Sequence, residues 1–168
     1  MNTSEVLLDA FDRVTGTARR AVQNIAADDL TFRVDPDANT ISWLVWHLAR
    51  VNDDHVADAF GSEQVWTAQG WYDRFGLPFD RAEIGYGQST EDVGRVKAPA
   101  DLLLGYLDAV HEATAAHLRT VTDADLDRVV DTAWDPPVTL GVRLISVISD
   151  GLQHAGQAAF VRGIADRR

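Results

Sequence analysis

The stretch TLGVRLISVISDGLQHAGQAAFVRG, residues 139–163, has the pattern of a long amphipathic helix. Its apolar residues recur at spacings of three and four, which is typical of one buried face of an α-helix. They are Leu144, Ile145, Ile148, Leu152, Ala155, Ala159 and Val161. Thr139 can cap this helix. Asp150 and His154 lie four residues apart, so their side chains project from successive turns in the same direction.

Three earlier segments show the same periodicity and predict helices over residues 4–27, from about 40 to 60, and from 99 to about 121. Asn39 or Thr40 can cap the second helix, Gly61 can end it, and Pro99 suits the first turn of the third. The pattern shows no internal repeat and no series of strands. Four helices joined by two long connections predict one all-α domain over residues 1–168, a four-helix bundle.

The composition limits the class of protein. Hydrophobic residues make up 46% of the 168 residues, which is typical of a globular chain. No apolar run is long enough to cross a bilayer and the N-terminus has no signal-peptide pattern, so we expect a cytoplasmic protein without a membrane partner. The chain has no cysteine, which excludes disulfides, thiolate ligands and a cysteine nucleophile. A metal must then be bound by His, Asp or Glu, and any reacting thiol must come from outside the chain.

The formal net charge is −11, from 15 basic and 26 acidic residues. An acidic chain repels phosphate backbones unless it has a concentrated basic patch, and the pairs Arg19-Arg20 and Arg167-Arg168 are short. We therefore expect a small-molecule substrate and no nucleic-acid partner. The single lysine, Lys97, beside many arginines indicates a GC-rich genome.

Residues 61–98 lack helical periodicity and are rich in glycine and in large aromatic side chains. Long connections in compact domains are often functional, and this aromatic content argues against disorder. We expect a long crossing with short helical turns. Trp66, Trp71 and Tyr72 are predicted to form the walls of a pocket.

Three potential metal ligands lie on the inner sides of two predicted helices. His47 follows Leu44 by three residues and is at the edge of the buried face, and Asp150 and His154 have the same relation to the apolar stripe of the last helix. Bundles build metal sites from side chains on facing helices. Two imidazoles and a carboxylate suit Zn²⁺ with an open position, and Ni²⁺, Fe²⁺ or Mn²⁺ are also compatible. By spacing alone, the alternative is a half-exposed His and an Asp that pair with each other or with an arginine such as Arg50.

The segments NTISWLVWHLARV, residues 39–51, and TLGVRLISVISDGLQHAGQAAFVRG resemble the DinB-like superfamily, most nearly the actinobacterial branch that includes mycothiol-dependent maleylpyruvate isomerase. That family has a His in its second helix and (His/Glu)-x-x-x-His-x-Gly-(Gln/His) in its last. The matching positions here are His47, Asp150, His154, Gly156 and Gln157. The resemblance implies an up-down-down-up bundle with a long crossing between helices two and three, and a divalent metal bound by His47, Asp150 and His154. Asp150 departs from the pattern, because it is one methylene shorter than Glu.

Three more polar residues are candidates around this site. Gln157 lies three residues beyond His154 and is a candidate to orient an imidazole, with a surface polar residue as the alternative. Asp54, seven residues after His47, is a candidate acceptor for a ligand His, although a solvated acid is the favoured interpretation. His117 falls in the inward stripe of the third helix, where a core or boundary His is favoured over a fourth ligand.

Three functions remain open at this point. The resemblance implies a metal-dependent enzyme that uses mycothiol, a low-molecular-weight thiol, for S-transfer to a small electrophile or for its isomerisation, with no catalytic base assigned. The second is a non-catalytic bundle that binds a metal or a small molecule in a stress or detoxification response. The third is a structural bundle that dimerises through an apolar helix face; the family also implies a homodimer.

Overall fold

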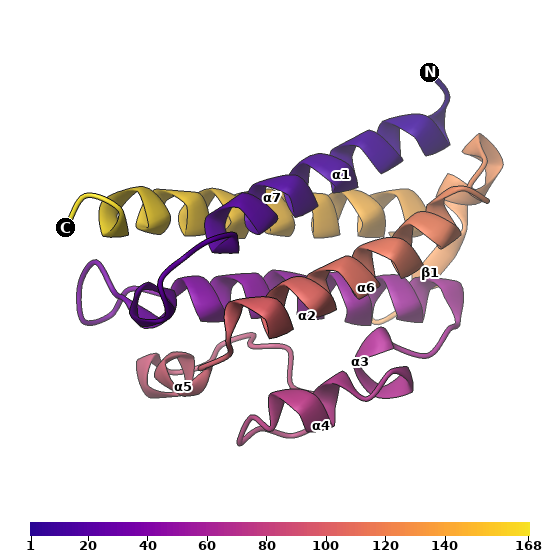
Figure 1. Ribbon diagram of the computed structural model, residues 1–168. Coiled ribbons are helices and arrows are strands. Elements are labelled where there is room, and N and C mark those ends of the chain that lie inside the picture. Colours follow the sequence, from indigo (N-terminus) through magenta and orange to yellow (C-terminus); the bar gives the residue numbers. More distant parts are fainter.

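The computed structural model describes residues 1–168, and four long helices running side by side form its main body (Figure 1). They are α1 (Thr3–Val22), α2 (Ile41–Phe60), α6 (Ala100–Leu118) and α7 (Leu140–Ala165). α1 and α7 run in one direction and α2 and α6 in the other (Figure 1), which is the predicted up-down-down-up order. The all-α bundle predicted from the sequence is therefore confirmed. None of the helices is both long and apolar enough to cross a membrane.

The helix ends agree with the sequence pattern, with one exception. Thr40 caps α2 by accepting a backbone N–H of the first turn, and Gly61 ends that helix in the left-handed conformation, with a φ of 64°. Thr139 caps α7 in the same way as Thr40 caps α2. α1 ends at Val22, about one turn earlier than predicted, because the chain then becomes extended and Asn24 has a left-handed backbone with a φ of 56°.

The four helices pack as a square in cross-section. α7 packs against α1 and α2, and α6 packs against the same two helices, so that α1 and α2 occupy opposite corners. α1 and α7 approach closely at Gly151, where a Cβ atom would lie 2.8 Å from Cγ1 of Val14. Apolar side chains from all four helices fill the interior. α2 and α7, which carry the three candidate ligands, are therefore direct neighbours in the bundle.

A short hairpin precedes α7. β1 (Val129–Asp131) and β2 (Val138–Thr139) pair antiparallel. The sequence pattern had indicated no strands here, and that expectation is corrected. The reason is length, because strands of three and two residues carry too few side chains to show an alternation. Arg143 donates to Asp131 at 2.6 Å and joins the hairpin to α7.

The predicted long crossing between α2 and α6 runs along the outside of both helices (Figure 1). It contains the predicted short helical turns. These are α3 (Val65–Ala68), α4 (Trp71–Phe75) and α5 (Thr90–Arg95). Two 3₁₀ turns lie in the other connections, namely η1 (Ala27–Thr31) and η2 (Asp123–Asp127).

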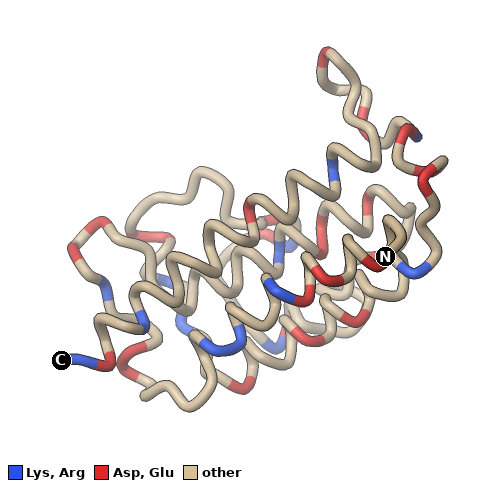
Figure 2. The backbone as a smooth tube through the Cα atoms, turned by 90° about the horizontal axis from the view of Figure 1, so that it is seen from above, with Lys and Arg blue, Asp and Glu red and all other residues tan.

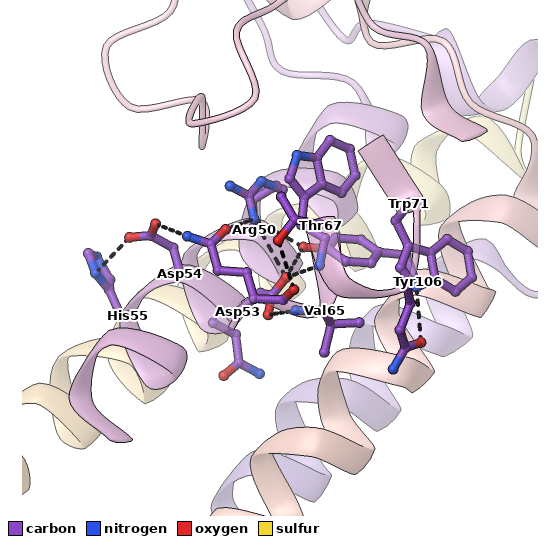
Figure 3. A network of polar contacts seen from close by, with 12 residues as sticks. Arg50, Asp53, Asp54, His55, Val65, Thr67, Trp71 and Tyr106 are labelled. Carbon is purple, nitrogen blue, oxygen red and sulfur yellow. Dashed lines mark hydrogen bonds and ion pairs between the residues drawn. The ribbon is translucent and has the colours of Figure 1, made fainter. Parts of the chain in front are cut away.

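A buried carboxylate anchors the crossing to α2 (Figure 3). Asp53 accepts the backbone N–H groups of Val65 at 2.8 Å and Trp66 at 2.7 Å, and also the hydroxyl of Tyr106 at 2.8 Å. Arg50, which is fully buried, places Nη1 at 3.6 Å from Asp53. Burial raises the pKa of Asp53, and the hydrogen bonds and the arginine oppose that shift. A side chain of α2 thus caps α3 and ties it to α6.

Ion pairs cover the surface of the bundle. Figure 2 shows acidic positions on every side of the backbone, with basic positions interspersed among them. Several arginines lie against carboxylates, as in the pairs Arg13–Asp9 and Arg19–Asp108, both at 2.6 Å. The arginines therefore neutralise neighbouring acids, as the net charge of −11 leads one to expect.

The substitution Asp53→Asn should lower the free energy of unfolding by about 2–4 kcal/mol. An amide cannot accept all three hydrogen bonds, and Arg50 would lose its counter-charge in a buried position. Urea unfolding followed by circular dichroism measures the change. Asp9→Asn is the matched control, because it breaks an exposed pair with Arg13 and should leave the free energy of unfolding nearly unchanged. Equal stability of the two variants would contradict the anchoring role of Asp53.

Candidate metal centre

The three predicted ligands converge between α2 and α7. His47, Asp150 and His154 each place one potential ligand atom within 4.8 Å of the others. The two imidazole rings lie 4.8 Å apart, centroid to centroid, at an angle of 73°. His47 is 5% exposed, whereas the other two are half-buried, so the cluster opens to solvent on the α7 side.

His47 has a defined tautomer. Its Nδ1 lies 2.5 Å from the carbonyl oxygen of Ile84, which can only accept, so Nδ1 carries the hydrogen and Nε2 keeps its lone pair. Trp43 stacks on the ring at 4.5 Å and is itself held by a hydrogen bond to Gln88 at 2.8 Å. Burial lowers the pKa of His47 and outweighs the hydrogen bond to Ile84, which raises it. The neutral imidazole that a metal requires is therefore favoured.

His154 is oriented in a similar way. Its Nδ1 lies 2.8 Å from Oε1 of Gln157, and its Nε2 lies 3.5 Å from Oδ1 of Asp150. Burial lowers the pKa of His154, but the hydrogen bonds to Asp150 and Gln157 together outweigh it, so that the pKa is raised. The hydrogen bond to Gln157 thus orients the His154 ring so that its Nε2 is directed at Asp150.

The carboxylate of Asp150 lacks one of the partners that a buried charged group requires. Its Oδ2 is buried and has no hydrogen-bond partner, which is costly for a carboxylate. Two ligands of a tetrahedral Zn²⁺ with bonds of about 2.0–2.1 Å lie about 3.4 Å apart, and Asp150 Oδ1 lies 3.5 Å from His154 Nε2. The side chain of Asp150, although one methylene shorter than that of Glu, is therefore long enough to share a cation with His154. The donor types suit a divalent cation, the spacing of Asp150 and His154 fits one, and a nitrogen of His47 lies within 4.8 Å of both.

The backbone that holds His47 comes from residues 83–88 of the crossing. Glu83 Oε1 accepts the N–H groups of Ile84 at 3.0 Å and Gly85 at 2.7 Å, which fixes a tight turn against α2. Gly85 has a φ of 95°, and a Cβ atom there would lie 2.7 Å from Nδ1 of His47. The sequence pattern did not point to this turn. The only feature of the sequence that indicates a turn here is the pair Gly85 and Gly87 on either side of Tyr86.

Asp54 does not contact the cluster. Its Oδ1 accepts from Gln64 at 2.8 Å, and its Oδ2 lies 3.3 Å from Nδ1 of His55 (Figure 3). Asp54 therefore does not take the candidate role of acceptor for a ligand His, over which the sequence pattern had favoured a solvated acid. Seven residues return it to the same face as His47, but they also move it about 10 Å along the helix axis.

His117 is a boundary residue of α6 and lies beside the C-terminal end of α2. Its ring stacks on Phe60 at 4.5 Å, and its Nε2 lies 3.2 Å from the hydroxyl of Ser62. It does not belong to the cluster of His47, Asp150 and His154. The favoured interpretation of His117 as a boundary His, and not a fourth ligand, agrees with this placement.

The predicted pocket walls Trp66, Trp71 and Tyr72 pack within the crossing instead. Trp66 and Trp71 are buried against Tyr106, at centroid distances of 5.1 and 5.6 Å. The hydroxyl of Tyr72 donates to the carbonyl of Phe79 at 3.2 Å. The expectation of pocket walls is therefore wrong, because these rings fill the space between the crossing and α6.

Gly85→Ala should displace the turn that holds His47, because the new methyl group would lie 2.7 Å from Nδ1 and 3.0 Å from Trp46 Cζ3. We expect the slowly exchanging Nδ1–H signal of His47 to disappear from the imidazole NMR spectrum. Gly87→Ala is the matched control, since Gly87 also has a positive φ of 72° but has no neighbour within 4 Å of a Cβ atom. A signal retained in both variants, or lost in both, would show that the clash at Gly85 does not control the tautomer of His47.

The comparisons with known proteins agree with the helical-bundle fold. A family model described as Mycothiol-S-transferase matches residues 6–167. The crystal structure of a conserved protein from Enterococcus faecalis superposes with a TM-score of 0.91 at 28% sequence identity, over 100% of this chain and 99% of that one. No curated protein matches the chain. With a family model that covers nearly the whole sequence and a bundle of the predicted topology, the chain belongs to the mycothiol-S-transferase family of the DinB-like superfamily.

Proposed function

We propose that the protein is a metal-dependent enzyme that joins mycothiol, through its sulfur, to a small electrophile. The observation that carries this proposal is the convergence of His47, Asp150 and His154, in which a buried oxygen of Asp150 has no partner. Zn²⁺ is the favoured ion, because two imidazoles and one carboxylate are ligands that it commonly has in open sites, with Ni²⁺, Fe²⁺ and Mn²⁺ as alternatives.

The ion would supply one chemical effect, since a bound divalent cation lowers the pKa of a thiol and makes the thiolate available at neutral pH. His47, Asp150 and His154 would hold the ion. Ile84 and Gln157 accept from the Nδ1–H groups of the two imidazoles and keep both Nε2 atoms directed inward. Trp43 covers the flat face of His47 and excludes water from it.

The absence of cysteine supports an external thiol. In the reaction, the sulfur forms a bond to the electrophilic carbon, the leaving group departs with its electron pair, and the thiol proton goes to water. The donor set contributes a single negative charge, from Asp150. The site as a whole therefore stays positive with a divalent ion and favours a thiolate over a neutral thiol.

Metal content and thiol transfer test this proposal together. The full chain is purified without added metal, its metal is measured by mass spectrometry, and the mycothiol-dependent loss of 1-chloro-2,4-dinitrobenzene is followed. His154→Ala and Asp150→Ala should lose the near-stoichiometric ion and most of the turnover. His117→Ala is the matched control, because it removes a half-buried His outside the cluster and should change neither.

The outcomes separate the candidate functions. Wild-type protein that contains no metal, and turns over as fast as the His154→Ala variant, would contradict the metal site. A stoichiometric ion without any thiol-dependent turnover would favour the non-catalytic binding protein.

A further inference from the structure

A groove of about 270 Å³ lies beside the candidate metal centre. Its walls come from the loop before α2, from the first turn of α2 and from the last turns of α7. Its lining side chains include Val34, Asp37, Asn39, Leu44, Gln157 and Phe160.

The groove begins one helical turn from both imidazoles. Leu44 precedes His47 by three residues on α2, and Gln157 follows His154 by three residues on α7. Because α2 and α7 run in opposite directions (Figure 1), both steps lead toward the same end of the bundle, by about 4.5 Å. Gln157 lines the groove and also accepts from His154. A molecule in the groove would therefore have one end next to the imidazoles.

The only charged side chain that lines the groove is the carboxylate of Asp37. The neighbouring guanidinium of Arg33 is engaged elsewhere, because it donates to the carbonyls of Pro36 at 2.9 Å and Thr90 at 2.6 Å. An anion in the groove would face Asp37 with no cation among the lining side chains. Electrostatics thus favour a neutral or cationic occupant.

The groove also exposes apolar surface. Phe160 is 65% exposed and Val34 is 39% exposed, so both have area that an occupant would cover. A hydroxyl-rich sugar thiol would place its polar groups against Phe160, Val34 and Leu44 and lose their hydration. An apolar molecule would gain by the same contact, while Asn39 and Gln157 offer a few polar partners.

We infer that this groove binds the electrophilic co-substrate, and that this co-substrate is a small apolar molecule that is neutral or cationic. The groove directs the reactive end of the molecule toward His47 and His154. This role rests on the proposed thiol transfer, but occupancy of the groove is measurable without metal or thiol.

Three probes of one shape and different charge test the inference, namely benzylamine, benzyl alcohol and benzoate. Each is titrated into the metal-free full chain, since a carboxylate would otherwise bind a metal directly. The side-chain amide signals of Asn39 and Gln157 in ¹H–¹⁵N NMR spectra report binding in the groove. Benzylamine and benzyl alcohol should shift both signals, and benzoate should bind at least about tenfold more weakly than benzylamine.

Two variants assign the effect to the groove. Phe160→Ala should weaken the binding of benzyl alcohol about tenfold, and Asp37→Asn should reduce the preference for benzylamine over benzoate at least threefold. Trp134→Ala is the matched control, because it removes another exposed aromatic ring, in the hairpin, and should change nothing. Benzoate binding as tightly as benzylamine, or no effect of Phe160→Ala, would overturn the inference. Neither result depends on whether the chain binds a metal.

Discussion

The buried guanidinium of Arg50 connects the scaffold to the site. It lies 3.6 Å from Asp53, which caps α3, and its Nε donates to the carbonyl of Glu83 at 3.2 Å. The next residue, Ile84, presents the carbonyl that accepts from His47. Arg50 and His47 are three residues apart on α2, so one face of a single helix holds the crossing near its start and near its middle and orients a candidate ligand.

Such a buried pair is not explained by stability alone. Removing two charges from water costs several kcal/mol per ion, and a well-packed apolar pair is often equally stable. Arg50 also leaves its Nη2 without a partner. The pair fixes the position of the crossing on α2, because Arg50 donates to Glu83 and Asp53 accepts from the first residues of α3. The carbonyl of Ile84 must lie within hydrogen-bond distance of one imidazole, and an apolar contact would not define it so closely.

The sequence predicted the parts that depend on local periodicity. The caps Thr40 and Thr139 and the shared direction of Asp150 and His154 follow from patterns within single helices. The convergence of these two residues with His47 of α2 was implied by the family resemblance, because spacing alone left an Asp and a His without a metal as the alternative. The turn that presents Ile84 does not follow from such a pattern, since Ile84 comes 37 positions after His47, across the rest of α2 and the first part of the irregular crossing. The candidate role of Asp54 failed because helical phase was considered without the distance along the axis. Trp66 and Trp71 were assigned to a pocket because the sequence does not reveal that Tyr106 lies beneath them.

In the proposed site, two imidazoles and one carboxylate from α2 and α7 share a divalent cation. X-ray absorption at the zinc edge of the zinc-loaded full chain tests this coordination. We expect two imidazoles in the first coordination sphere, with all ligands at about 2.0–2.2 Å, and one imidazole fewer in the His47→Ala variant. A zinc spectrum without imidazole scattering, or one that is identical in the two proteins, would contradict it.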